Sequence, residues 1–159
     1  MGPGGVEVRV LQMAMAYAAI ANNGTVYVPQ VVERVESNDG HLIVAYEPKA
    51  AKTVKTPADA LETWKKGMYL VTNQLGGTAF EHGHIENVTV LGKTGTAEVL
   101  KHHKESDEKD GDRWNPNAAH AWFAGWAPAE DPEIAIVVLS ENGGAGEQHH
   151  ADRGEHHQW

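Results

Sequence analysis

Apolar positions near the start of the chain predict a helix. They are Val10, Met13, Ala14, Tyr17, Ala18 and Ile20. Most of these residues are three or four positions apart, which places them on one face of a helix. The helix is predicted to end at Asn22, Asn23 and Gly24, because glycine readily adopts the left-handed conformation that closes many helices.

Two β-branched runs follow, and together they predict a β-hairpin. The first run is TVYVPQVVERVES at residues 25–37, and the second is HLIVAYEP at residues 41–48. The segment Asn38-Asp39-Gly40 between them is a strong turn signal. Pro29 has no backbone N–H to give to a ladder, so it is expected at a sheet edge or at a bend.

A second helix is predicted after the hairpin. Thr56 is the expected N-cap, Pro57 the first helical residue, and Asp59 a favourable anion in the first turn. The expected buried face consists of Leu61, Trp64, Met68, Leu70 and Val71. Gly76 and Gly77 are expected to end this helix.

Three apolar runs in the second half predict three strands in antiparallel succession, at residues 87–99, 120–128 and 133–142. The charged run KHHKESDEKDGDRWNPNA at residues 101–118 has no apolar period, so it is predicted to be a solvated loop. His82 and His84 are assigned to a solvated loop before the first of these strands. The whole order predicts an α+β fold with an antiparallel sheet and two helices.

Length, charge and composition exclude several classes of function. A chain of 159 residues, 41% of them apolar, is long enough for one folded domain with its own core. The formal net charge is −9, so the surface does not attract the phosphate backbone of nucleic acid. No apolar run approaches the roughly 18 residues that a transmembrane helix needs. We therefore expect no nucleic-acid partner and no membrane segment in this stretch of sequence.

The sequence Lys93-Thr94-Gly95-Thr96 lies within the first of the three predicted strands. A lysine supplies a cation for a carboxylate, threonine hydroxyls offer hydrogen bonds, and glycine lets a ligand approach the backbone closely. Four residues of this kind are a weak signal by themselves. Their meaning depends on the rest of the chain.

Four stretches resemble, in the same order, the C-terminal part of a penicillin-binding protein transpeptidase domain of the high-molecular-mass, cell-elongation or division type. They are GPGGVEVRVLQMAMAYAAIANNG, GMYLVTNQLGGTAF, VLGKTGTAEV and HAWFAGWAPAEDPEIAIVVLSENGG. The resemblance assigns residues 1–146 to that domain and leaves residues 147–159 as a tail outside the family pattern. It implies a partial penicillin-binding/serine β-lactamase-like fold, in which the last helix is replaced by the tail.

The resemblance also implies roles for the motif residues. Lys93 would help to hold the carboxylate of a β-lactam or of a peptidoglycan stem peptide, and Thr94 and Thr96 would hydrogen-bond the same ligand. The backbone N–H of Thr96 would be one of two oxyanion-hole donors. Trp122 and Phe123 would lie on the neighbouring strand and pack the sheet.

The family's nucleophile has no counterpart at its usual place in this sequence. In the family, a Ser-x-x-Lys element comes before the Lys-Thr-Gly strand. The serines here are Ser37, Ser106 and Ser140. Ser106 and Lys109 match the spacing but follow the strand within the charged run, so we interpret the match as chance. Without an acylating serine and its lysine base, the covalent catalysis of the family is not expected.

We therefore interpret the chain as a truncated transpeptidase fragment without the Ser-x-x-Lys half. The parent family is membrane-anchored, with its catalytic domain on the periplasmic or extracytoplasmic side. This resemblance does not assign a compartment to the fragment itself. No biological role of its own follows from the sequence.

Residues 147–159, EQHHADRGEHHQW, are rich in histidine and almost free of apolar residues. The family would continue here with a closing helix that covers the sheet. Our hypothesis is a one-nucleotide frame shift near Gly146, which would put residues 147–159 out of frame. One choice of codons for the tail, read from the second nucleotide, encodes a stretch that resembles the start of that closing helix. A sheet without that helix exposes apolar surface, so we expect a homo-oligomer formed by edge pairing or domain swapping.

The tail also supports an alternative function, which is metal-dependent hydrolysis. His149, Asp152 and His156 would share one face of a helix as a two-histidine, one-carboxylate set for zinc, iron or manganese. His150 and His157 repeat the seven-residue step on an adjacent face. Further ligands could come from His102, His103 or His120. A zinc ion with an open position would activate water for the hydrolysis of activated esters or phosphoesters. Histidine-rich ends also bind metal without function, and that interpretation stays open.

Overall fold

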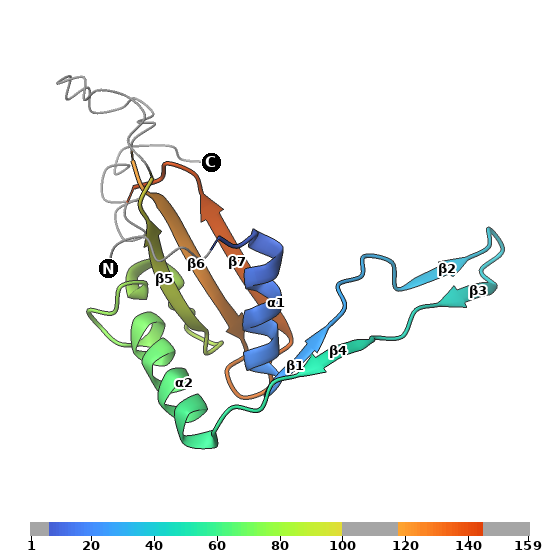
Figure 1. The fold of residues 1–159 in the computed structure, drawn as a ribbon, viewed down its shortest axis with the longest axis horizontal. Helices are drawn as coiled ribbons and strands as arrows, with labels where there is room; N and C mark the ends of the chain where they lie inside the picture. The colour runs from blue at the N-terminus through green and yellow to red at the C-terminus, as the bar shows by residue number, and fades with distance from the viewer. Residues whose placement is uncertain (1–6, 100–117, 145–159) are drawn as a thin grey trace.

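The computed structural model describes residues 7–99 and 118–144. A three-stranded sheet with helices beside it forms the body of the molecule, and a long two-stranded arm extends away from this body (Figure 1). None of the helices in the described residues is long and apolar enough to cross a membrane. The predicted loop at residues 101–118, apart from Ala118, and the tail at 147–159 lie outside the described residues.

In spatial order, the sheet of the body consists of β5 (Leu91–Ala97), β6 (His120–Ala127) and β7 (Ile134–Ser140). Both strand pairs are antiparallel, which confirms the three predicted strands and their succession. The register places Thr94 opposite Phe123 and Gly95 opposite Trp122. Within the described part of the chain β5 pairs with β6 alone, so β5 is an edge strand whose second side is open.

The first helix, α1 (Val10–Ala21), packs against β6 and β7. It ends as predicted: Gly24 has a φ of +114°, and its backbone N–H donates to the carbonyl of Ala19 at 2.6 Å. The buried core cluster consists of Tyr17, Ala21, Met68, Leu91, Ala124 and Trp126. Helix α1, helix α2 and the sheet therefore share one hydrophobic core.

The second helix, α2 (Ala58–Asn73), begins later than predicted. Pro57 is the residue before the helix, with a ψ of 136°, and no side chain caps the first turn. The prediction that Thr56 is the N-cap and Pro57 the first helical residue is therefore wrong. The extended backbone at Pro57 keeps that residue out of the helix and moves the start to Ala58.

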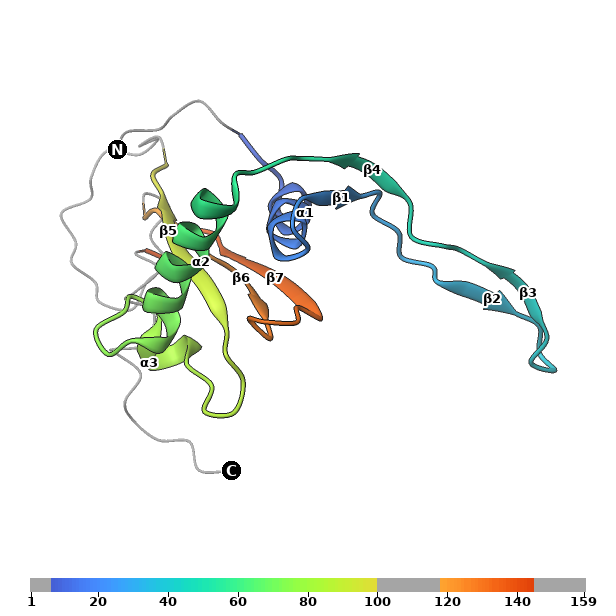
Figure 2. The same cartoon turned by 90° about the horizontal axis from the view of Figure 1, so that it is seen from below.

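The buried face of α2 is narrower than predicted. Met68 and Thr72 are buried, whereas Trp64 is 44% exposed and Leu70 is 42% exposed. The helix lies along the β5 side of the sheet (Figure 2). A helix at the side of a sheet buries a narrow stripe, so the prediction of burial was wrong for Trp64 and Leu70. Trp64 instead packs its ring 5.9 Å from the ring of Tyr17, centroid to centroid.

The arm contains both predicted β-branched runs. Its strands are β1 (Thr25–Tyr27), β2 (Arg34–Glu36), β3 (Leu42–Ala45) and β4 (Ala50–Thr53). β2 pairs with β3 across the predicted turn, where Gly40 has a φ of +85°, so the hairpin is confirmed. β1 pairs with β4, a pair that was not predicted from the sequence. Pro29 lies outside the strands, in the segment between β1 and β2.

A third helix, α3 (Phe80–Gly83), follows α2, so the described residues contain one helix more than predicted. His82 lies within it and His84 directly after it, and the assignment of His82 to a loop is wrong. The rings of Phe80 and His84 stack with centroids 5.1 Å apart. A helix of four residues is too short to show an apolar period, which explains why the pattern missed it.

One face of the sheet carries exposed apolar side chains. Helix α1 lies on the other face (Figure 2). Along β7 the side chains alternate between the two faces: Ala135 and Val137 pack against the core cluster, whereas Ile134, Ile136 and Val138 are 62%, 47% and 50% exposed. No described residue buries these three side chains.

Candidate ligand-binding site

The four predicted motif residues lie next to one another on the edge strand β5. Lys93 and Thr96 are exposed, Gly95 is half-buried, and Thr94 is 9% exposed. All four line one cavity of about 490 Å³. The structure therefore brings the whole sequence-predicted ligand-binding set together at one open site.

The other walls of this cavity come from α1 and β6. Met13 and Tyr17 of α1 line it, together with His120 and Trp122 of β6. Trp122 was predicted to pack the sheet, and it also lines this cavity. Phe123 packs against β5 as predicted, so closely that a Cβ added to Gly92 would lie 2.4 Å from its ring.

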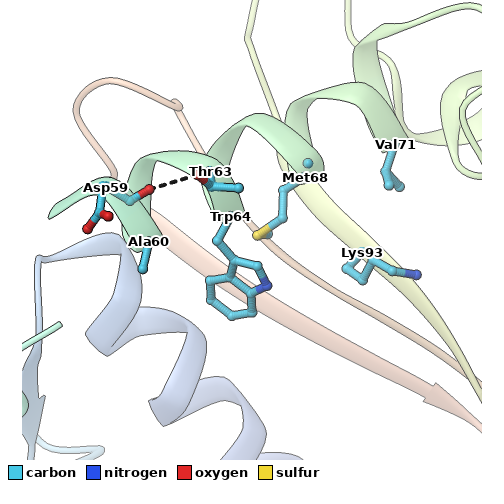
Figure 3. Close-up of a pocket in the computed structure, with 8 residues that line it drawn as sticks. Asp59, Ala60, Thr63, Trp64, Met68, Val71 and Lys93 are labelled. Carbon is cyan, nitrogen blue, oxygen red and sulfur yellow. Dashed lines mark hydrogen bonds between the residues drawn. The ribbon is translucent and has the colours of Figure 1, made fainter. Parts of the chain in front are cut away.

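Lys93 lies where this cavity meets a second one. The second cavity, of about 530 Å³, is bounded by Lys93 on β5 and by side chains of α2 that include Trp64 and Met68 (Figure 3). The ammonium group of Lys93 donates to the carbonyl of Thr94 at 2.6 Å. No carboxylate of the described residues forms an ion pair with it. The ammonium group is therefore held by a neutral carbonyl, so its positive charge is available for an ion pair with a bound anion.

A polar clamp fixes the position of β5 relative to α2. The hydroxyl of Thr72, which is fully buried, donates to the carbonyl of Val90 at 2.6 Å. The side-chain amide of Asn73 donates to the same carbonyl at 2.8 Å. Val90 directly precedes β5, so the end of α2 holds the start of the motif strand. This clamp was not predicted from the sequence, because an internal threonine and a terminal asparagine are ordinary helix residues.

The hydroxyl of Thr78 contacts the motif directly. Its Oγ1 lies 2.9 Å from Oγ1 of Thr94. Thr78 lies in the turn between α2 and α3, directly after Gly76 and Gly77, which were predicted only to end the helix. A polar residue directly after a Gly-Gly turn and before the motif was the available signal.

His120 accepts a hydrogen bond from the backbone just after the end of β7. The backbone N–H of Asn142 donates to Nδ1 of His120 at 2.8 Å. His120 was predicted as a further metal ligand. Because this hydrogen bond occupies Nδ1, a metal ion would have to bind His120 through Nε2.

The other predicted metal ligands cannot be placed. His149, His150, Asp152, His156 and His157 lie outside the described residues, as do His102 and His103. Within residues 7–99 and 118–144, no three His, Cys, Asp or Glu side chains are grouped closely enough to hold a metal ion.

Tyr17 is the buried titratable group of the site. It is 9% exposed, and its ring packs edge-on against Trp126 with centroids 6.4 Å apart. Burial raises the pKa of Tyr17 above its ordinary value, because the phenolate would lose its hydration. The phenol is therefore neutral at physiological pH and contributes no charge to the cavity.

We expect the free energy of unfolding to fall as the pH rises above about 10, the ordinary tyrosine pKa. In that range Tyr17 of the unfolded chain loses its proton, whereas Tyr17 of the folded chain keeps it. The unfolded state then binds fewer protons, so alkali favours unfolding. Denaturant titrations at increasing pH measure this slope. The variant Tyr17→Phe should show a smaller slope, and an unchanged slope would assign the effect to other groups.

Comparison with known proteins gives a family and several solved relatives. A family model described as "Penicillin binding protein transpeptidase domain" matches residues 1–155. The peptidoglycan D,D-transpeptidase MrdA of Haemophilus influenzae is 33% identical in an alignment of 144 residues, and the match covers 86% of this chain and 21% of that protein. The chain therefore spans about a fifth of the length of this curated relative.

Two solved structures resemble the fold over almost the whole chain. The imipenem acyl-enzyme complex of penicillin-binding protein A from Mycobacterium tuberculosis gives a TM-score of 0.66 at 28% identity, covering 91% of this chain and 29% of that one. The D,D-transpeptidase domain of a peptidoglycan glycosyltransferase from Eggerthella lenta gives 0.65 at 29% identity, covering 94% and 32%. In both, this chain corresponds to under a third of the solved chain.

Proposed function

Because this chain belongs to the family of penicillin-binding protein transpeptidase domains, we propose that it is the part of such a domain that carries the Lys-Thr-Gly ligand-binding strand. We propose further that these 159 residues bind β-lactams or peptidoglycan stem peptides non-covalently and are not acylated by them. The observation that carries the proposal is the open edge of β5, where Lys93, Thr94, Gly95 and Thr96 line one cavity.

The chemistry of this edge suits a carboxylate ligand. Lys93 provides a positive charge, and Thr94 and Thr96 provide hydroxyl donors within the same short strand. The carbonyl of Thr94 accepts from the Lys93 ammonium group, so it points away from β6. In a strand, the N–H and the carbonyl of one residue point to the same side, and the residue two positions on points them to that side too. The N–H of Thr96 therefore points toward the open edge, as the carbonyl of Thr94 does. That N–H is the oxyanion-type donor that the family resemblance implies.

The positions of the serines support the absence of acylation. Ser37 directly follows β2, in the connection to β3, and these two strands form the end of the arm that lies far from the sheet (Figure 1). Ser140 lies opposite Ala121, which in turn lies opposite Thr96, so two strand spacings of roughly 5 Å each separate it from the edge of β5. Ser106 lies outside the described residues. Neither described serine is placed to attack a ligand held by Lys93.

We expect no covalent adduct after incubation with benzylpenicillin, and intact-mass spectrometry measures this directly. An adduct at one equivalent per chain would contradict the proposal. Non-covalent binding is measured by titrating the protein with benzylpenicillin and following the amide signals of Gly95 and Thr96 by NMR.

Replacing Lys93 by glutamine should weaken this binding about tenfold or more, because a charge-assisted hydrogen bond to the ligand carboxylate is lost. The matched control is Lys66→Gln, which makes the same change at an exposed position of α2 outside both cavities. Equal affinities of the two variants would show that the ligand does not bind at the motif.

Two further proposals concern oligomerisation and metal binding. We propose that the chain forms a homo-oligomer, and the exposed side chains of Ile134, Ile136 and Val138 support this. A monodisperse monomer mass in light scattering would count against it. The metal-dependent hydrolase alternative depends on tail residues outside the described part, and elemental analysis of the purified protein tests whether a metal is bound.

A further inference from the structure

The contact between Thr78 and Thr94 links the motif strand to a residue outside it. Their hydroxyl oxygens lie 2.9 Å apart, although the two residues are 16 positions apart in sequence. Thr94 is 9% exposed, whereas Thr78 is exposed. The buried hydroxyl of the motif is therefore in contact with a hydroxyl that faces solvent.

The turn that carries Thr78 is held by its backbone and not by this hydroxyl contact. The N–H of Gly77 donates to the carbonyl of Gln74 at 2.8 Å, and the N–H of Ala79 donates to the carbonyl of Val71 at 3.0 Å. A Cβ at Gly77 would lie 2.3 Å from the carbonyl oxygen of Leu70, so the turn sits directly against α2. Both neighbours of Thr78 are anchored without its side chain. The hydroxyl is therefore free to act on Thr94.

The binding of a carboxylate would fix which of the two hydroxyls, Thr78 or Thr94, donates the hydrogen bond between them. A hydroxyl has one hydrogen and two lone pairs, and an ionised carboxylate only accepts. If Thr94 donates its hydrogen to the carboxylate, it cannot donate to Thr78, so Thr78 must donate to Thr94. The result is a chain of two hydroxyls that ends at the ligand, and such chains strengthen each member by polarisation.

We propose that Thr78 is a positioning residue, which donates to Thr94 and thereby turns the hydroxyl hydrogen of Thr94 toward the carboxylate of the ligand. This inference rests on the proposed function, because it concerns the same ligand at the same strand. It assigns to the Gly-Gly-Thr turn a role in selecting ligands with a free carboxylate. Thr78 itself does not touch the ligand.

The test compares two ligands that differ only in the carboxylate, benzylpenicillin and its methyl ester, on the full chain. Wild type is expected to bind the acid more tightly than the ester. The variant Thr78→Val should lose about three- to tenfold in affinity for the acid, as expected for one hydrogen bond, and keep its affinity for the ester. Thr78→Ser keeps the hydroxyl and should restore the affinity for the acid. Thr53→Val makes the same change in the exposed arm and should alter neither affinity.

A double-mutant cycle separates positioning from a structural effect. Thr94→Val should lower the affinity for the acid, and adding Thr78→Val to it should cause no further loss, because the two hydroxyls act as one unit. If adding Thr78→Val to Thr94→Val lowers the affinity for the acid by as much as Thr78→Val does alone, the inference is overturned. It is also overturned if Thr78→Val keeps the preference for the acid over the ester while Thr94→Val loses that preference. If wild type itself does not prefer the acid, the proposed function fails, and this inference fails with it.

Should Thr78→Val not fold, Thr78→Ala makes the same test with a smaller side chain. Thermal unfolding of each variant shows whether that variant is folded at the temperature at which its affinity is measured. A loss of affinity for acid and ester alike, at unchanged unfolding temperature, would also overturn the inference, because a positioning role through Thr94 predicts an effect on the acid alone.

Discussion

Replacing Trp126 by alanine is expected to remove about 3–5 kcal/mol of folding stability. Trp126 is 0% exposed and belongs to the cluster that joins α1, α2 and the sheet. The substitution removes the largest fully buried side chain of the described residues and leaves a cavity, whose cost adds to that of the lost apolar burial. A domain of this kind has about 5–15 kcal/mol in total, so a substantial part of its stability would be lost.

Chemical denaturation followed by tryptophan fluorescence and far-ultraviolet circular dichroism measures this effect. The control is Trp126→Phe, which keeps most of the apolar volume. The indole N–H of Trp126 is buried without a hydrogen-bond partner in the described part of the structure, so its removal gives up no such bond. Phenylalanine should therefore cost clearly less than alanine. Equal losses for the two variants would mean that packing at this position is not what stabilises the core.

Replacing Gly125 by alanine is expected to cost about 3 kcal/mol, at the upper end for an overpacked position. A Cβ at Gly125 would lie 2.5 Å from the carbonyl oxygen of Leu91 and 3.0 Å from Cα of Gly92. Both contacts are with backbone atoms of β5, which cannot move aside as a flexible side chain can. The new methyl group must push β5 away from β6, and β5 carries Lys93. Affinity for a carboxylate ligand should therefore fall together with stability.

Two other glycines serve as controls for this prediction. A Cβ at Gly67, within α2, meets nothing within 4 Å, so Gly67→Ala should stabilise the protein by about 1 kcal/mol through helix propensity. A Cβ at Gly95 comes within 3.4 Å of Cβ of Trp122, an ordinary contact. Gly95→Ala should therefore leave the fold nearly unchanged but obstruct a ligand at the strand. Denaturation curves and benzylpenicillin titrations of the three variants should separate these outcomes; a stable Gly125→Ala would contradict the argument.

The sequence by itself determined those parts of the protein that follow from short-range patterns. The apolar period around Tyr17 and the glycine at position 24 predicted α1 and its end, and the turn at Gly40 predicted the β2–β3 hairpin. Runs of β-branched and aromatic residues predicted the strands of the sheet. The ligand-binding motif at Lys93 could also be recognised from the sequence, because its four residues are consecutive and the chemistry of their groups does not depend on the fold.

The tertiary structure decided everything that joins positions far apart in the chain. Thr72 reaches the carbonyl of Val90 across 18 positions, and Thr78 reaches Thr94 across 16. No local signal identifies the partner of either threonine, because each hydroxyl meets its partner only after α2 has packed beside β5. The exposure of Trp64 has the same origin: its side chain is apolar and correctly spaced, but the helix lies at the side of the sheet. The periodicity of apolar residues predicts which residues share one face of a helix. Whether that face is buried depends on how the helix packs against the sheet.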